Sequence, residues 1–291
     1  MSATALPIRR EAPPLLPERS SPLSVRLGRL VLPVYTSLAV AYLFLPIAVM
    51  IAFSFNDPRG RQNITWQGFT FQNYLDIWSR PDITGPMLTS LTVAVVSTLI
   101  ATALGTLIGL ALTRYQFAGR GSLNLLIFLP MATPEIIMGA SLLSLYVSLG
   151  VQRDITTIVV AHVAFNISYV VVTVRARLTG FNRTLEEAAM DLGADEWTTF
   201  RKVTFPLIFP GILAAALLAF ALSIDDYVIT SFVSGRTITF PLWVFGVSRL
   251  GVPPEVNVIG TLIFVTALVF IALQVWAQRR DLGKLRPVVG R

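Results

Sequence analysis

Five polar side chains that could bind a solute lie in or beside long apolar stretches of the sequence: Glu135, His162, Asn166, Asp225 and Asp226. Ionisable groups are costly inside a membrane, and those that occur there are usually functional. Carboxylates beside a watery cavity attract cations, so this set predicts a path for a positively charged solute. His162 and Asn166 are spaced to share one face of a helix, where they could contact a solute or hydrogen-bond neighbouring helices.

The position of each carboxylate along its stretch predicts its depth in a bilayer. Glu135 lies about 12 residues into the third apolar stretch, hence about 18 Å into about 30 Å of hydrocarbon. Pro130 and Pro134 precede it and would interrupt the helix. Its carboxylate could line the solute path, or be neutralised or paired with a neighbouring helix. Asp225 and Asp226 follow the fifth stretch at its outer end, where they could attract a cation or mark the membrane boundary.

The sequence has no residues arranged for catalysis. It contains no cysteine and a single histidine, which excludes thiolate chemistry and disfavours a histidine-based metal site. The patterns G-x-x-x-x-G-K-[ST], H-E-x-x-H and G-x-S-x-G are also absent, so the chain should not hydrolyse ATP by itself. We therefore expect no catalytic residue, no metal and no cofactor in this chain. An intramembrane enzyme is a disfavoured alternative.

The elements that must position the polar residues are apolar helices. The 291 residues are 54% hydrophobic and only 13% charged, whereas soluble domains carry about 25% charged residues. The sequence predicts an all-α membrane protein with six transmembrane helices within residues 30–278, each about 20 residues or longer. The first stretch is too long for a cleavable signal peptide. The six stretches are Leu30–Phe55, Met87–Leu112, Leu123–Leu149, Ile155–Val174, Phe205–Ile224 and Val258–Trp276.

The basic residues predict the orientation in the membrane. Residues 1–29 form a flexible tail rich in proline and arginine, and residues 279–291 form a second basic tail. Positive charge marks the cytoplasmic side, so both termini are predicted to be cytoplasmic, and the net charge of +7 reports orientation rather than a nucleic acid partner. Of the 23 Lys and Arg residues, only six lie in segments expected on the other side: Arg59, Arg61, Arg80, Arg153, Arg236 and Arg249.

Two further patterns predict helix packing and a gate. Gly105 and Gly109 form a small-xxx-small pattern, which lets two membrane helices approach closely. The segment Tyr227–Asn257 is too apolar for a free loop. We interpret it as a folded gate region that dips toward the pore, which irregular backbone can do only beside protein or a watery cavity.

A polar segment, Thr184–Gly211, separates the fourth and fifth apolar stretches. Thr184 and Glu187 have the spacing of a capping box, which would start a helix near residue 185. Gly193 can adopt the left-handed conformation that ends a helix, and Asp195 can cap a second one. The segment is therefore predicted to form two short helices hinged at Gly193, on the cytoplasmic side.

Two other interpretations of this segment fit less well. A helix, a glycine turn and a second helix also resemble a DNA-binding helix-turn-helix, but between Arg175 and Lys202 the acidic residues balance the basic ones. No basic recognition face is left. An amphipathic helix lying on the lipid would normally carry a polar face rich in Lys and Arg rather than in acidic residues.

The polar segment resembles the EAA loop of membrane permease subunits in binding-protein-dependent ABC importers of the type I fold. The resemblance covers most of the chain, from the second stretch to the last. It departs from the family's Ile-x-Leu-Pro ending at Val203 and Phe205, which keep the apolar character. The loop residues that match are Glu187, Ala188, Ala189, Gly193 and Val203-Thr204-Phe205-Pro206, and the polyamine branch is matched through Ser223-Ile224-Asp225-Asp226, Ser231-Phe232-Val233-Ser234-Gly235 and Leu250-Gly251-Val252-Pro253-Pro254-Glu255-Val256-Asn257.

The resemblance implies a permease subunit of the bacterial inner membrane that forms half of a pore for a small cationic solute, such as spermidine or putrescine. It also implies a second permease subunit, a dimer of ATP-binding subunits that binds the ATP and Mg, and a soluble periplasmic or lipid-anchored substrate-binding protein. Residues 184–203 would be the coupling helix seated in the ATPase. The residues implied in this contact are Glu187, Ala188, Ala189, Asp191, Leu192, Gly193 and Ala194.

Two alternatives stay open at this point. The solute could be an amino acid or another small organic molecule, because the acidic residues alone do not fix its identity. The chain could also be a secondary transporter or channel driven by an ion gradient. ATP-dependent uptake that resists an uncoupler in sealed vesicles would separate the importer from this second alternative.

Overall fold

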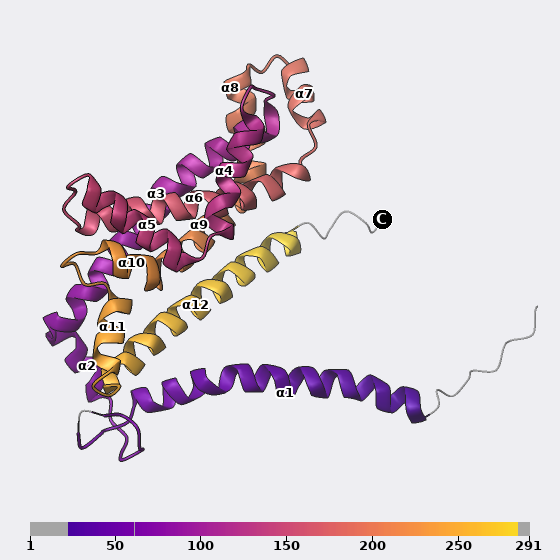
Figure 1. The fold of residues 1–291 in the computed structure, drawn as a ribbon. Coiled ribbons are helices and arrows are strands. Elements are labelled where there is room, and N and C mark those ends of the chain that lie inside the picture. Colours follow the sequence, from indigo (N-terminus) through magenta and orange to yellow (C-terminus); the bar gives the residue numbers. More distant parts are fainter. Residues whose placement is uncertain (1–22, 61, 285–291) are drawn as a thin grey trace, which may run out of the picture. The chain divides into compact units, whose positions relative to one another are not determined.

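The computed structural model describes residues 23–60 and 62–284, in which the regular secondary structure is helical and the one β-bridge, between Asn56 and Phe69, is isolated (Figure 1). The predicted all-α class is confirmed for these residues. The elements are α1 (Leu23–Ser54), α2 (Gln72–Asp76), η1 (Ile77–Ser79), α3 (Pro81–Arg114), α4 (Arg120–Ala132), α5 (Glu135–Ser148), α6 (Ile155–Thr179), α7 (Thr184–Asp191), α8 (Glu196–Thr199), η2 (Phe200–Thr204), α9 (Phe205–Ile224), α10 (Val228–Val233), α11 (Phe240–Ser248) and α12 (Pro254–Lys284).

The chain divides into two units, residues 1–52 and residues 53–291. The first unit consists of most of α1, which contains Pro33 and Pro46. The predicted N-terminal tail, residues 1–29, lies mostly outside the described residues, and its last residues already belong to α1. At the other end, α12 continues to Lys284, so the predicted C-terminal tail begins inside a helix and otherwise lies outside the described residues.

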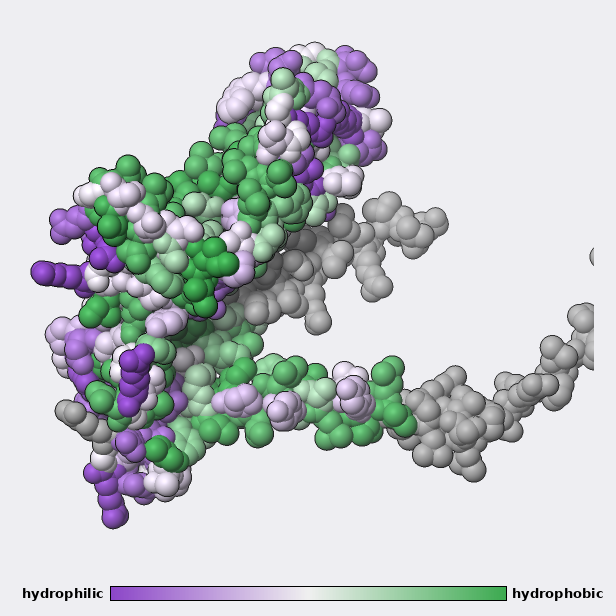
Figure 2. Space-filling view, in the orientation of Figure 1, coloured by the Kyte–Doolittle hydropathy of each residue, from purple (hydrophilic) through white to green (hydrophobic). Residues whose placement is uncertain are grey.

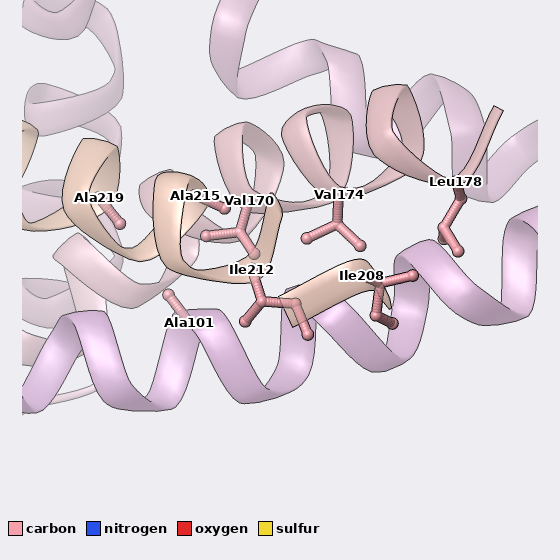
Figure 3. Close-up of a cluster of buried hydrophobic side chains, with 8 residues drawn as sticks. All are labelled: Ala101, Val170, Val174, Leu178, Ile208, Ile212, Ala215 and Ala219. Atoms are coloured by element: carbon pink, nitrogen blue, oxygen red, sulfur yellow. The ribbon is translucent and has the colours of Figure 1, made fainter. Parts of the chain in front are cut away.

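The centre of the second unit is a bundle of α3, α6 and α9. Small residues allow these helices to approach closely, since Ala101 on α3 and Ala215 and Ala219 on α9 are fully buried. Larger apolar side chains fill the rest of the interface, as Figure 3 shows. The whole cluster consists of Ala101, Val170, Val174, Leu178, Ile208, Ile212, Ala215 and Ala219.

The predicted close approach at Gly105 and Gly109 is confirmed, and the second helix is α6. A Cβ atom on Gly105 would lie 2.6 Å from Val170 Cγ1, whereas a Cβ atom on Gly109 would lie 3.4 Å from Val174 Cγ1. The first distance is far shorter than van der Waals contact, and the second is an ordinary contact. Gly105 is therefore the point at which α3 and α6 can tolerate no side chain.

We expect Gly105→Ala to destabilise the protein by about 1–3 kcal/mol, because the branched Val170 side chain cannot move aside without disturbing the bundle. Gly109→Ala is the matched control and should be close to neutral or slightly stabilising, since it adds helix propensity without a clash. Thermal unfolding of the two variants in detergent measures the difference. Equal midpoints for both would show that the α3–α6 contact is looser than described.

Four described helical segments are long and apolar enough to cross a membrane, and a fifth exists if the bent pair α4 and α5 is counted as one span. They are Val31–Ser54, Pro81–Arg114, Ile155–Thr179 and Glu196–Ile224. The sixth predicted span, Val258–Trp276, lies within α12. The described apolar part of α12, Pro254–Val269, is shorter than the others, so the count of six stays a prediction.

The predicted interruption of the third span, Leu123–Leu149, is confirmed at Pro134, whereas Pro130 lies inside α4 without breaking it. Helices α4 and α5 meet at a bend of 109°. The cause is Pro134, which has no N–H to donate and forces the preceding residue into an extended conformation. Thr133 accordingly has φ −85° and ψ 130°. The depth predicted for Glu135, which assumed a continuous helix, therefore does not hold.

The predicted gate region, Tyr227–Asn257, is folded into α10 and α11 rather than forming a free loop. Helix α10 is packed against α5 and α6, where Ile229 and Val233 join a buried apolar cluster with Tyr146 and Phe165. Near α11, Phe240 and Trp243 pack against another buried cluster, which includes the start of α12. Much of the bundle surface between its polar ends is apolar, as Figure 2 shows, which is consistent with helices that face lipid.

Candidate coupling surface and substrate path

The glycine turn between α7 and α8 has the predicted geometry. Gly193 has φ +88°, and the N–H of Ala194 donates to the Ala189 carbonyl over 3.1 Å, which satisfies a free carbonyl at the helix end. Asp195 caps α8 as predicted, because its Oδ1 accepts from the Thr198 N–H over 2.9 Å. Hydrogen bonds from Thr198 also lower the pKa of Asp195, which keeps the cap ionised.

The predicted capping box at the start of α7 is wrong. Instead, Asn182 Oδ1 accepts from the Thr184 N–H over 3.1 Å and from Thr184 Oγ1 over 2.8 Å. The Glu187 N–H, which a capping box would direct to the Thr184 hydroxyl, donates to the Arg183 carbonyl over 3.2 Å. The helix begins at Thr184 rather than one residue later. Glu187, which the capping box would have used, is exposed.

The second short helix is not separate from the fifth span. Helix α8, the π-helical turn η2 and α9 form one continuous helix from Glu196 to Ile224. In η2 the N–H of Phe205 donates to the carbonyl of Phe200, which is the wider i→i+5 bond of a π-helix. The prediction that the fifth span begins at Phe205 is corrected, because the π-helical turn carries the backbone through to Pro206 without a break.

The residues predicted to contact an ATPase lie at one end of the bundle, on α7 and in the turn after it (Figure 1). Leu192 is 90% exposed and Trp197 is 67% exposed, and Leu185 and Met190 of α7 are exposed as well, within an end of the molecule where many residues are hydrophilic (Figure 2). Large exposed apolar side chains in a polar setting are typical of a docking surface. Of the predicted set, Glu187, Ala188, Asp191, Leu192 and Gly193 are exposed, and Ala189 and Ala194 are half-buried.

At the other end of α9, four helices are joined by a buried chain of polar side chains. His162 Nδ1 on α6 lies 2.6 Å from Ser223 Oγ on α9, and Ser223 Oγ lies 3.0 Å from Ser97 Oγ on α3. His162 Nε2 lies 2.9 Å from Thr230 Oγ1 on α10. Thr230 Oγ1 in turn donates to Asp226 Oδ2 over 2.7 Å. A neutral imidazole that accepts at Nδ1 and donates at Nε2 satisfies every atom of this chain.

The structure brings two of the predicted path residues together and leaves the other three apart from them. His162 Nε2 is 3.3 Å from Asp226 Oδ2, and His162 is 3% exposed. Asn166, one turn further along α6, is fully buried, and its side-chain amide has no hydrogen-bond partner among the described residues. Asp225 and Glu135 are both exposed. Glu135 lies in the first turn of α5, directly after the bend.

The partners of His162 were not predicted from the sequence. Ser97, Ser223 and Thr230 are fully or almost fully buried, and each contributes a hydroxyl to the chain. The available signal is weak, because single Ser and Thr residues are common in membrane helices as interhelical glue. These residues come together only in the folded bundle, because Ser223 is 61 positions and Thr230 is 68 positions from His162 in the sequence.

No group of three or more His, Cys, Asp or Glu side chains that could hold a metal ion occurs among the described residues. The described part of the chain combines a bundle of helices long and apolar enough to cross a membrane with an exposed pair of short helices, α7 and α8, at one end. The sequence of residues 101–280 matches the family described as "Binding-protein-dependent transport system inner membrane component". The chain belongs to this family of inner-membrane permease subunits of ABC transporters.

Three similar proteins illustrate the match. The spermidine/putrescine transport system permease protein PotC of Escherichia coli strain K12 is 39% identical over 259 residues, which cover 88% of this chain and 97% of PotC. The putrescine transport system permease protein PotI of the same strain is 38% identical over 234 residues, covering 78% and 83%. A solved bacterial ABC transporter involved in alginate import shares the fold, with a TM-score of 0.62, 18% identity, and coverage of 88% of this chain and 97% of the other.

Proposed function

We propose that this chain is one half of the membrane pathway of an ATP-driven importer for a polyamine such as spermidine or putrescine. The observation that carries the proposal is the 39% identity to PotC, which extends over almost the whole length of that permease. The proposed arrangement has six transmembrane helices, with α12 as the sixth, and both termini in the cytoplasm. The distribution of Lys and Arg supports this orientation, because it favours the α7 end on the cytoplasmic side.

The importer would contain three kinds of partner. A second permease subunit completes the pore, two ATP-binding subunits hold ATP and Mg, and a substrate-binding protein delivers the solute from outside. The exposed Leu192 and Trp197 beside the Gly193 turn support α7 and this turn as the coupling element. Small side chains at Ala188 and Ala189 would allow a groove of the ATPase to approach the helix closely, and Glu187 would pair with a basic residue there.

Within the pathway, we propose different roles for the polar residues. Glu135 and Asp225 are exposed carboxylates and are suited to contact a cationic solute. His162 and Asp226 bind one another and the hydroxyls around them, so they would shape the pathway rather than bind the solute directly. The unpartnered amide of Asn166 is a candidate contact for solute or water once the bundle rearranges.

The test is transport by the complete complex, with its second permease, ATPase and binding protein, reconstituted in sealed vesicles. We expect ATP-dependent accumulation of radiolabelled putrescine or spermidine that persists after an uncoupler is added. Mass spectrometry of the ligand copurified with the binding protein should identify the same polyamine. Accumulation of an amino acid instead would contradict the substrate, and loss of uptake with the uncoupler would contradict the ATP-driven mechanism.

A further inference from the structure

We infer that Glu186 is a positioning residue that ties the coupling helix α7 to two membrane helices at once, α3 and α9. The inference rests on the proposed function, because it concerns how a push on α7 reaches the pathway. Glu186 belongs to the first turn of α7, directly before Glu187. Its side chain is only 13% exposed, which is unusual for a carboxylate on a short surface helix.

Glu186 Oε1 has two partners from different helices. It forms an ion pair with Arg114, the last residue of α3, and it accepts a hydrogen bond from the Thr204 hydroxyl in the π-helical turn η2. Thr204 is fully buried. A second hydrogen bond joins the start of α7 to α3: Arg183 Nη2 donates to the Thr113 carbonyl near the end of α3 over 3.3 Å. Helix α7 is thus held to α3 twice and to the start of the fifth span once.

These contacts join α7 to helices that share one buried apolar core. Helix α7 follows α6 after a short connection at residues 180–183. Arg177 near the end of α6 also donates to the Leu207 carbonyl of α9, over 3.1 Å from Nη2. Since α3, α6 and α9 share one buried core, a displacement of α7 would be passed to all three as a rigid body. Without Glu186, a displacement of α7 would reach the bundle mainly through the chain connections to α6 and, by way of the Gly193 turn, to α8.

Glu186 and Glu187 therefore have different roles, one within the chain and one toward a partner protein. Adjacent residues on a helix point about 100° apart, and the structure places Glu186 inward, bonded to its own chain, and Glu187 outward and exposed. Glu187 is suited to bind a partner protein. Glu186 is already bonded to Arg114 and Thr204, so it is suited to transmit a movement of α7 to α3 and α9.

The experiment compares Glu186→Gln with Glu187→Gln in the complete complex, by two independent measurements. Hydrogen exchange in detergent measures how strongly the contacts of Glu186 with Arg114 and Thr204 hold these segments in place. In Glu186→Gln, amide exchange in residues 184–191 and 200–204 should rise about tenfold, the change expected when a hydrogen bond to a charged group is lost. In Glu187→Gln, exchange in residues 200–204 should stay at the wild-type level, because the loss of ATPase subunits would uncover α7 but would leave the buried Thr204 bonded to Glu186.

Transport in vesicles reports the transmission. Glu186→Gln should retain its ATPase subunits on purification but transport about tenfold fewer putrescine molecules per ATP hydrolysed. Glu187→Gln should instead lose ATPase subunits. Arg114→Lys keeps the positive charge beside Glu186 and should retain most of the wild-type ratio of transport to hydrolysis. Thr204→Val leaves the ion pair intact and should give a smaller defect than Glu186→Gln. It provides the test if Glu186→Gln fails to fold.

Wild-type exchange rates in Glu186→Gln, or a wild-type ratio of transport to hydrolysis, would overturn the inference. Loss of ATPase subunits from Glu186→Gln to the same extent as from Glu187→Gln would overturn it as well. If the wild-type complex transports no polyamine while the exchange rates differ as expected, the proposed substrate fails and the tie through Glu186 stands.

Discussion

Replacing Gly193 with Asp is expected to abolish uptake while leaving the protein folded in the membrane. A Cβ atom at this position would meet nothing within 4 Å, so the substitution causes no clash within the chain. The left-handed φ of +88° adds strain of only about 1–2 kcal/mol. The larger effect falls on the docking surface, where a carboxylate would project between the exposed Leu192 and the half-buried Ala194. The measurements are uptake in vesicles and the amount of ATPase that copurifies.

A matched control separates backbone strain from the loss of docking. Gly150 has φ +65° and also has open space around its missing side chain, but it lies in the turn between α5 and α6, away from α7 (Figure 1). Gly150→Asp should therefore retain uptake and bind the ATPase normally. If Gly193→Asp transports at the wild-type rate, the coupling role of the turn is excluded. If both variants fail equally, strain rather than docking is the cause.

The turn at Gly193 could be predicted from the sequence because its physics is local. A glycine that ends one helix and an aspartate that begins the next act on backbone groups only a few residues away. The same reasoning failed at the start of α7, where the two N–H groups of the proposed capping box have other acceptors: the Thr184 N–H donates to Asn182 Oδ1 and the Glu187 N–H to the Arg183 carbonyl. Local rules state which groups can bond, but they do not decide between two neighbours that offer the same hydrogen bond.

The internal ties could not be predicted, because they join residues that are distant in the sequence. Glu186 is 72 residues from Arg114. Glutamate and arginine are common on protein surfaces, so their types alone do not indicate that they pair with each other. The bend between α4 and α5 was predicted only in part, because both Pro130 and Pro134 were expected to interrupt the helix. Pro130 lies inside α4, which continues through it, whereas Pro134 ends that helix, and composition alone does not distinguish the two. Tertiary packing decides which proline a membrane helix tolerates.

Asp226→Asn is expected to lower uptake at least tenfold by disrupting the packing of α10, whereas Asp225→Asn should alter substrate binding alone. Asp226 Oδ2 accepts from both the N–H and the hydroxyl of Thr230, over 2.8 and 2.7 Å, and lies 3.3 Å from His162 Nε2. The other carboxylate oxygen, Oδ1, accepts from the Ile229 N–H over 3.3 Å. An amide in place of the carboxylate offers one acceptor oxygen where these donors use two. Each buried donor left without a partner costs about 1–3 kcal/mol.

The two aspartates are neighbours in the sequence, so each is a control for the other. Asp225 is exposed, and its carboxylate makes no hydrogen bond or ion pair with another described residue. Asp225→Asn should therefore assemble and unfold like the wild type but show a raised KM for putrescine at an unchanged maximal rate, and Glu135→Gln should behave in the same way. Asp226→Asn should instead give less purified complex with a lower thermal midpoint. A reversed pattern, in which Asp226→Asn is stable with a raised KM, would place the cation beside His162 and remove the structural role from this pair.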